Sequence, residues 1–433
     1  MPDRQADFHR GYEAGYAKGV AAGRQGFGER FDGVSIIIPT FNKKEMLLEC
    51  LDSIEAFTDY PYELIVVDNG SRDGTAEELR RRRGPLRLAV NQANLGFARA
   101  VNIGLMMAKG RYLVLLNNDV LVTERWIVQL LRCLRESPDA AAVGPVTNYI
   151  SGEQQIETAY GDITGMRAFA AAHNRSDPGK WRDADRLVGF CLLFPRSTFE
   201  QIGYFDEGYE LGNFEDDDWI LRLRLQGKKL KIAGDTFVHH YGSMTMKELG
   251  ERKFAEVNVK NGGFFEEKWG RIHAYLSSRE EGLRSGGSFL RMPDFYPPFC
   301  WVRSATGRIY WLEAGTRRLL APQLMTGSIR EQAVRLSVVD LLQIPVGPEI
   351  STPEELFGLQ RKQREQLAVF QDAEERLYIN DRGTRREIVS AYTSRVWGLP
   401  LPSSPSPVTG PGLSELPEGH PVLPPVVLAS DVL

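Results

Sequence analysis

An apolar run that ends in three polar residues constrains the fold more than any other stretch of the chain. Residues 112–116 (Tyr-Leu-Val-Leu-Leu) predict a strand buried on both faces, because none of the five is charged. Asn117, Asn118 and Asp119 follow directly. Strands of this kind belong to parallel sheets of α/β folds, which bind ligands at the carboxyl ends of their strands. Taken alone, Asn-Asn-Asp can also be the polar start of a loop.

The same pattern recurs from residue 32 to residue 275, where strand-like and helix-like segments alternate as in a doubly wound sheet. The strand-like runs cover 34–38, 62–67, 86–90 and 187–194. Several of them end in Asn, Asp, Ser or Thr, which favours a ligand site over a single polar loop. Residues 151–186 lack a clear period, and we expect a long connection with a short helix around 166–172.

Three further regions flank this predicted domain. Residues 1–31 form an arm in which glycines and aromatic residues recur at every fourth position. Residues 276–398 contain two similar sequences, Arg308–Arg318 and Arg376–Arg386, which predict two hairpins in a smaller β-rich module. Residues 399–433 are rich in Pro, Ser and Gly, and we expect a disordered tail. The arm and the module are both candidates for self-association.

Composition excludes some functions. The net charge of −4 gives no basic footprint, so we expect no nucleic-acid partner. No apolar run approaches the roughly 20 residues that span a bilayer, and no signal peptide is evident. The four cysteines share no metal-ligand spacing. We therefore expect a soluble, cytoplasmic protein without a transmembrane segment, which can act at the inner membrane surface.

A series of short motifs between Gly33 and Tyr275 resembles the inverting family-2 glycosyltransferases with the GT-A fold, a group that includes bacterial rhamnosyltransferases. The motifs are Ser35–Asn42, Val67–Thr75, Asn94–Ala98, Leu116–Asp119, Gly203–Glu207, Glu215-Asp216 with Arg222, and His240–Ser243. The resemblance implies a Rossmann-like domain that binds a nucleotide-sugar donor, UDP- or dTDP-linked. It also implies a hydroxyl acceptor on a glycan, a lipid-linked glycan or a protein, in bacterial surface glycan or glycoprotein assembly.

The resemblance carries a set of donor-binding residues over to this chain. They are Pro39, Thr40, Asn42, Asp68, Asn94, Arg99, Asn117, Asn118, Asp119 and Arg222. Asp68 would accept a hydrogen bond from a uracil or thymine ring N–H or from a ribose hydroxyl, and Arg222 would face the diphosphate. Locally, Asp68 can instead form a turn and Asn94 can instead cap a helix.

The family's metal-binding D-x-D motif aligns with Asn117-Asn118-Asp119. Asparagine replaces the first aspartate, so Asp119 would carry most of the cation binding. The resemblance implies that a histidine completes the site, and His240 matches better than His239. Oxygen ligands favour Mg²⁺ or Mn²⁺, and an imidazole tilts the preference toward Mn²⁺. The alternative for the two histidines is a surface pair at a strand end.

The adjacent acids Glu215 and Asp216 match the family's catalytic pair. We expect Asp216 to be the base and Glu215 to position the acceptor or the metal shell. A carboxylate of pKa near ~4 cannot deprotonate a sugar hydroxyl in advance, so proton transfer must accompany attack on the anomeric carbon. The local alternative is that these acids stabilise the start of a helix. The enzyme reading requires Asp119 and Asp216 to face one pocket.

Three other functions fit these residues less well. A sugar-nucleotide pyrophosphorylase would need a Gly-rich loop where this chain has Pro39-Thr40-Phe41. A processive polysaccharide synthase would need transmembrane helices. A non-catalytic carbohydrate-binding protein, built on an inactivated transferase domain, is the main alternative, and the presence of Asp119, Asp216 and His240 argues against it.

Overall fold

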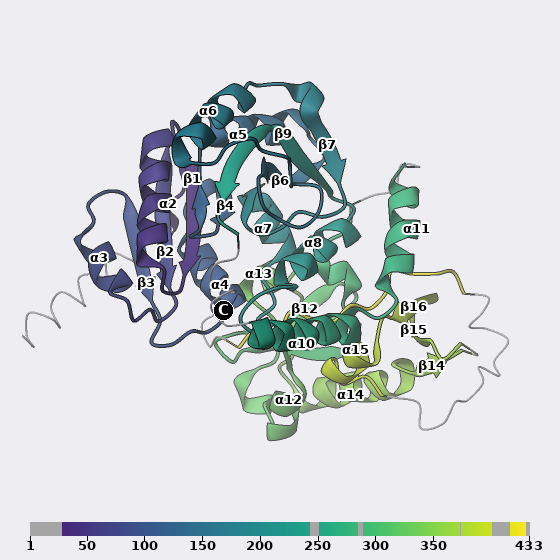
Figure 1. Ribbon diagram of the computed structural model, residues 1–433. Coiled ribbons are helices and arrows are strands. Elements are labelled where there is room, and N and C mark those ends of the chain that lie inside the picture. The colour runs from purple at the N-terminus through teal and green to yellow at the C-terminus, as the bar shows by residue number, and fades with distance from the viewer. Residues whose placement is uncertain (1–27, 243–250, 285–288, 373, 401–415, 430–433) are drawn as a thin grey trace, which may run out of the picture.

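The computed structural model describes residues 28–242, 251–284, 289–372, 374–400 and 416–429 (Figure 1). The predicted N-terminal arm lies outside these residues except for its last four positions. Figure 1 shows a larger unit built on a twisted sheet and a smaller module beside it, with a long helix, α10 (Glu251–Trp269), where the two meet.

The larger unit is organised around a mixed sheet that has nine strands in the described part of the chain. These strands are β1 (Phe31–Thr40), β2 (Tyr62–Asp68), β3 (Leu86–Val90), β4 (Gly110–Leu116), β5 (Val120–Leu121), β6 (Ala140–Thr147), β7 (Trp181–Ala184), β8 (Cys191–Pro195) and β9 (Lys229–His240). Their order is β3-β2-β1-β4-β8-β6-β9-β5, with β7 on the edge of β9. Strands β3, β2, β1 and β4 are parallel, so their carboxyl ends meet at one edge. This is the Rossmann-like arrangement that the motifs imply.

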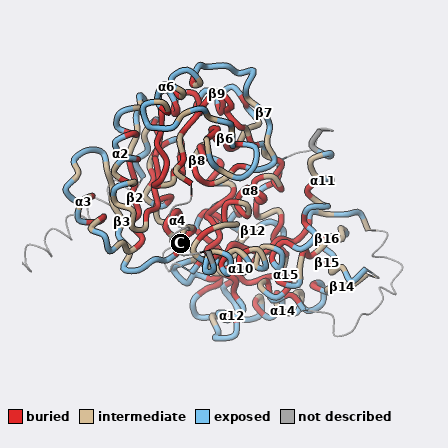
Figure 2. Tube along the Cα trace, viewed as in Figure 1, coloured by how far each residue is buried: buried red, intermediate tan, exposed pale blue. Residues whose placement is uncertain are grey.

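Helices cover both faces of this sheet. They are α2 (Lys44–Phe57), α3 (Thr75–Arg81), α4 (Phe97–Met107), α5 (Trp126–Glu136), α6 (Ile163–His173), α7 (Arg196–Ile202), α8 (Glu215–Leu225) and the short 3₁₀ helix η2 (Pro178–Lys180). Helix α11 (Ile272–Arg284) and α10 pack with α8 rather than on the sheet. Alternate strand residues enter two separate cores: Ile37 and Leu115 pack with α4, while Ile36 and Val114 pack with α2 and α5. Figure 2 shows the resulting buried residues along the sheet. The predicted α/β class is therefore confirmed, and α6 confirms the predicted short helix.

The smaller module contains two sheets and both predicted hairpins. Its strands are β10 (Cys300–Arg303), β11 (Ile309–Glu313), β12 (Thr316–Leu319), β13 (Val334–Arg335), β14 (Val369–Gln371), β15 (Leu377–Asp381) and β16 (Thr384–Ile388). Its helices are η3 (Met292–Phe295), η4 (Pro322–Leu324), α12 (Gly327–Gln332), α13 (Val338–Leu342), α14 (Pro353–Gln366) and α15 (Ala391–Val396). The hairpin β11–β12 turns at Ala314 (φ 52°) and Gly315 (φ 73°). The hairpin β15–β16 turns at Arg382 (φ 52°) and Gly383 (φ 81°). Positive φ at both central residues is the requirement of a two-residue hairpin turn.

The prediction of a disordered tail is wrong for residues 416–429. This segment, called the C-terminal strap below, forms isolated bridges with β16 and then returns to the larger unit (Figure 1). Val422 and Leu423 are fully buried, and Val426 joins the core of the larger unit. The Pro-rich composition of the tail gave no indication that its apolar residues are buried. They pack in clusters with residues that are distant in the sequence. Among the helices in the described ranges, none combines the length and apolar character needed to cross a membrane.

Candidate functional site

A pocket of about 180 Å³ opens where the carboxyl ends of β1, β2 and β4 meet. Its lining includes many of the residues predicted to bind the donor, the metal or the acceptor: Pro39, Thr40, Asn94, Asn117, Asn118, Asp119, Glu215, Asp216 and His240. The other lining residues are Phe41, Asn69, Phe97, Ile150, Val188, Gly189, Phe190, Leu211, Gly212 and Asn213. The structure therefore brings Asp119 and Asp216 to one cavity, although they are far apart in sequence.

Amide side chains join the strand ends on the nucleotide side of this pocket. The Asn118 side-chain amide donates a hydrogen bond to Thr40 Oγ1 over 2.8 Å, which links the ends of β4 and β1. The Asn69 amide donates to Asn94 Oδ1 over 2.8 Å and to the Gly96 carbonyl over 3.1 Å. Sequence reasoning missed Asn69 as a site residue, although its place directly after a buried strand is the signal that identified the others.

Strand pairing brings a histidine to Asp119. Strand β5 pairs antiparallel with the end of β9, and Val120 lies opposite His240. The His240 Nε2 atom lies 3.3 Å from Asp119 Oδ1. The other ring nitrogen, Nδ1, lies 2.7 Å from the Tyr149 carbonyl. A carbonyl only accepts hydrogen bonds, so Nδ1 carries the proton, and in the neutral ring Nε2 directs its lone pair toward the carboxylate.

These atoms fit a divalent cation. Mg²⁺ holds its ligands at about 2.1 Å, so neighbouring ligand atoms lie about 3 Å apart, close to the separation of Nε2 and Asp119 Oδ1. The buried Asn117 Oδ1 and His240 Nε2 form no hydrogen bond to any residue in the described ranges. Within those ranges, no cluster of three or more His, Cys, Asp or Glu side chains could hold a metal. The protein therefore offers a partial shell, the kind that Mg²⁺ and Mn²⁺ complete with phosphate and water oxygens.

The predicted acidic pair begins helix α8 and is buried in the pocket wall, with Glu215 5% and Asp216 7% exposed. Burial, and then the charge of Asp216, raise the pKa of Glu215 well above its ordinary value. Burial also raises the pKa of Asp216 to about 6, with Asp217 adding to the rise, while the Gly189 N–H opposes it. That N–H donates to Asp216 Oδ2 over 2.9 Å. The pKa of both carboxyls is therefore raised, and the Gly189 N–H opposes the rise at Asp216, which makes Asp216 the better candidate for the base.

Two predicted residues do not reach the pocket. The Arg222 side chain is fully buried, and its guanidinium donates to Asp218 Oδ1 and to the carbonyls of Ile202 and Tyr204. The expectation that Arg222 faces a diphosphate is therefore wrong, because every side of the guanidinium is turned toward the protein interior. His239 precedes His240 on a strand, so its ring points to the opposite face, where Nδ1 lies 2.7 Å from the Tyr160 hydroxyl.

Three other predicted residues, Asp68, Asn42 and Arg99, are also absent from the pocket lining. Asp68 is fully buried, and its Oδ1 accepts the Ser71 N–H over 3.0 Å, while Oδ2 has no hydrogen-bond partner among the described residues. Asn42 Oδ1 accepts the N–H of Arg72 over 3.0 Å. Arg99 Nε lies 3.8 Å from a carboxylate oxygen of Glu207. Asp68 therefore forms the predicted turn through Oδ1, while its buried Oδ2 forms no hydrogen bond with the described residues.

Comparisons with known proteins find similar chains among the glycosyltransferases. The family model for glycosyl transferase family 2 matches residues 35–203. A chondroitin synthase of Pasteurella multocida is 27% identical over 239 residues, which cover 48% of this chain and 24% of that protein. The N-acetylglucosaminyl-diphospho-decaprenol L-rhamnosyltransferase of Mycobacterium tuberculosis is 29% identical over 247 residues, which cover 50% of this chain and 79% of that protein.

Among solved structures, the mannosyltransferase PcManGT of Pyrobaculum calidifontis is 20% identical with a TM-score of 0.40, and the match covers 60% of this chain and 66% of that one. The similarity at this level is too distant to add to the argument. The chain spans about a quarter of the length of the chondroitin synthase and about four fifths of the rhamnosyltransferase. Residues 35–203 therefore match glycosyl transferase family 2, and through this domain the chain is similar to glycosyltransferases of that family.

Proposed function

We propose that this protein transfers a sugar from a UDP- or dTDP-linked donor to a glycan hydroxyl, with inversion at the anomeric carbon and with the help of a divalent cation. The observation that carries the proposal is that the Asp119–His240 pair and the Glu215–Asp216 pair line one pocket. One pair is suited to a cation beside a diphosphate, and the other to proton transfer.

The nucleotide is best accommodated at the ends of β1 and β2. Thr40 and Asn69 line the pocket there, and Asp68, which pairs with Thr40 across the two strands, has a buried Oδ2 without a hydrogen-bond partner in the described part of the chain. A carboxylate oxygen in this position would accept the ring N–H of uracil or thymine. An unpaired buried carboxylate is costly, which supports a ligand that supplies the missing donor.

Asp119 and His240 would hold the cation, with Asn117 Oδ1 beside them. When bound, Mn²⁺ or Mg²⁺ would neutralise the negative charge that develops on the leaving diphosphate. The imidazole ligand favours Mn²⁺ over Mg²⁺.

Asp216 is the base in this proposal. As the acceptor oxygen bonds to the anomeric carbon and the bond from that carbon to the diphosphate oxygen breaks, the hydroxyl proton passes to Asp216. A pKa of about 6 keeps Asp216 ionised at neutral pH and makes it a stronger base than an ordinary aspartate. The Gly189 N–H fixes the orientation of the carboxylate, and Glu215 lines the same pocket, where its carboxyl can form a hydrogen bond with the acceptor.

The acceptor is proposed to be a growing bacterial surface glycan, on a lipid or a protein. The support comes from the names of the relatives, one of which acts on a sugar diphospho-decaprenol. The reaction would then take place in the cytoplasm, where nucleotide sugars are available, at the inner membrane surface when the acceptor is lipid-linked.

Donor hydrolysis tests the proposal. A thermal-shift screen with Mn²⁺ first identifies the nucleotide sugar that binds, and its hydrolysis is then measured with and without Mn²⁺. We expect metal-dependent hydrolysis that Asp216→Asn lowers by about 10²–10⁴-fold. Asp183→Asn is the matched control, since the same change falls on an exposed carboxylate that pairs with Lys231 and does not line the pocket. Binding without turnover in the wild-type protein would favour the carbohydrate-binding alternative.

The cation site is tested in the same assay by comparing two adjacent histidines. His240→Gln removes the nitrogen beside Asp119, whereas His239→Gln alters a ring that faces the opposite side of β9. We expect only His240→Gln to weaken Mn²⁺ binding, by about tenfold or more, as measured by calorimetry in the presence of the nucleotide. Equal Mn²⁺ affinity in the two variants would contradict the assignment.

A further inference from the structure

We propose that helix α10 positions the acidic pair of α8 through two buried side chains, Asn261 and Lys268. The inference rests on the proposed function of Glu215 and Asp216. Asn261 is 1% exposed and Lys268 is fully buried, and both lie beyond the residues matched by the family model. They lie seven residues apart and therefore on the same face of the helix.

The loop that enters α8 has an unfavourable backbone conformation. Leu211, Asn213 and Phe214 have φ of 59°, 77° and 72°, in the left-handed region that residues other than glycine rarely adopt. Leu211 and Asn213 line the pocket, and Glu215 follows Phe214 directly. Backbone conformations of this kind persist only where surrounding contacts enforce them, and they cluster at functional sites.

Asn261 supplies those contacts. Its side-chain amide donates to the carbonyls of Glu210, Gly212 and Asn213 over 3.0, 2.9 and 3.1 Å. Its Oδ1 accepts the Glu210 N–H over 2.9 Å. The Asn261 side chain thus forms hydrogen bonds with one N–H and three carbonyls of the loop. Only a side chain that both donates and accepts hydrogen bonds, such as an amide, can do this.

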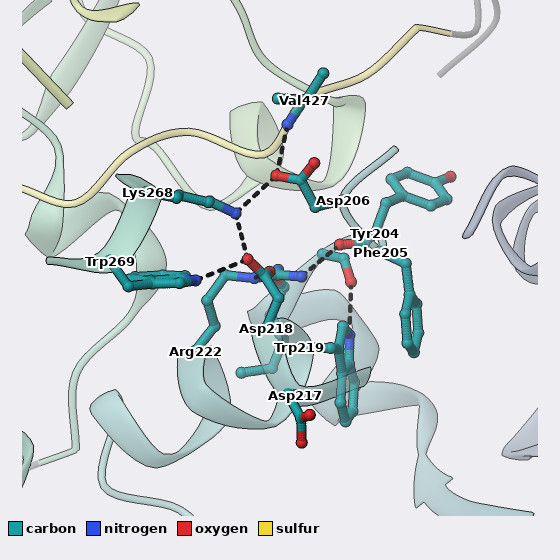
Figure 3. Close-up of polar contacts among 12 residues, drawn as sticks. Tyr204, Phe205, Asp206, Asp217, Asp218, Trp219, Arg222, Lys268, Trp269 and Val427 are labelled. Carbon is teal, nitrogen blue, oxygen red and sulfur yellow. Dashed lines mark hydrogen bonds and ion pairs between the residues drawn. The ribbon is translucent and has the colours of Figure 1, made fainter. Parts of the chain in front are cut away.

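Lys268 contacts Asp218, which follows the acidic pair on α8 (Figure 3). Its ammonium forms ion pairs with Asp218 and, over 2.7 Å, with Asp206. Asp218 lies in the first turn of α8, two residues after Asp216, and also accepts hydrogen bonds from Arg222 and from the Trp269 indole, each over 2.9 Å. All four charged groups are fully buried, and two positive charges balance two negative ones.

The two anchors therefore bracket the acidic pair. Asn261 fixes residues 210–213 before it, and Lys268 fixes Asp218 after it. Neither side chain contacts Thr40, Asn69 or Asn94 on the nucleotide side, as far as the hydrogen bonds of the described residues show. Loss of an anchor should therefore displace the base without weakening nucleotide binding.

The test compares Asn261→Ala with Asn258→Ala in the full-length protein. Asn258 lies nearly one turn earlier on α10 and accepts one hydrogen bond from the Asn213 side chain, and among the described residues it forms no hydrogen bond with the loop backbone. We expect Asn261→Ala to lower kcat for donor hydrolysis by about 10²-fold, the cost of misplacing a reacting group. The KM and the affinity for the free nucleotide should remain unchanged, and Asn258→Ala should behave like the wild type. Equal kcat in the two variants would overturn the proposal.

Two further measurements keep the inference testable. Hydrogen exchange at the first turn of α8 should be faster in Asn261→Ala than in Asn258→Ala, and unchanged exchange would overturn the inference even if the wild-type protein hydrolyses no nucleotide sugar. An inactive wild type with the expected exchange difference would refute only the proposed function.

For Lys268, the double variant Lys268→Met with Asp206→Asn removes one charge of each sign from the buried network. We expect it to lose kcat while it still binds nucleotide, and an unchanged kcat would contradict the role of Lys268.

Discussion

The division of roles between Glu215 and Asp216 arises from their surroundings, because both are carboxylates at the start of one helix. Asp216 receives the Gly189 N–H and lies near Arg186, which forms a bidentate pair with Asp217. Glu215 Oε2 is buried and has no hydrogen-bond partner in the residues that the structure describes. The more strongly stabilised carboxylate is the one that ionises first.

This difference predicts the pH dependence of catalysis. Because the pKa of Asp216 is raised to about 6, the base is lost as the pH falls through that value, and kcat/KM should fall on the acid side. Arg186 opposes the rise, so Arg186→Gln should move the acid limb to higher pH, by up to about one unit since the arginine is partly exposed. Arg182→Gln, which affects an exposed pair with Glu153, is the control. A pH–rate profile with the same acid limb in both variants would contradict this account.

Sequence patterns located the pocket residues because a strand end or a helix start fixes each of them. Asp119 follows β4, and Glu215 begins α8. The patterns misplaced Arg222 because its direction depends on which face of α8 is buried, and four acids before an apolar run do not reveal that face. Asn261 and Lys268 escaped notice for the same reason, since their partners lie on loops and helices about 50 residues away.

Among the elements, the C-terminal strap is the one whose role could not be predicted from composition. Its Val427 N–H donates to Asp206 Oδ2 over 3.1 Å, and its Val427 carbonyl accepts the Glu207 N–H over 2.9 Å. The hairpins were predictable because two residues determine each turn. The strap has no such local signal, because its conformation is fixed by side-chain carboxylates and one main-chain N–H of a turn more than two hundred residues earlier.

A proline in the strap tests this element. Val427→Pro removes the N–H that Asp206 accepts, whereas Val427→Ala keeps it and removes only part of a half-buried side chain. We expect Val427→Pro to lower the free energy of unfolding by about 1–3 kcal/mol relative to Val427→Ala. Urea denaturation followed by circular dichroism measures the difference. Equal denaturation midpoints would show that the hydrogen bond contributes nothing to stability.

At the scale of the whole molecule, the larger unit and the smaller module share a core. Leu221 and Leu225 of α8 pack in one cluster with Trp269 of α10, Val389 after β16 and Leu423 of the strap. The helix that begins with the acidic pair is thus buried against residues from the far end of the chain. The shared core predicts that the two parts unfold together and that the module contributes to the rigidity of the active site.

Leu423→Ala tests this coupling, because Leu423 is fully buried in the shared cluster. We expect a loss of about 2–5 kcal/mol in stability. The loss of nucleotide binding and the loss of tryptophan fluorescence should shift together to lower temperature in one transition. Ile379→Ala, which truncates an equally buried residue of the module's own core, should shift both signals together as well, because the two parts unfold as one. If Leu423→Ala lowered the transition of the module and left nucleotide binding at its wild-type temperature, the two parts would be independent, and the buried contacts of α8 would not depend on the strap.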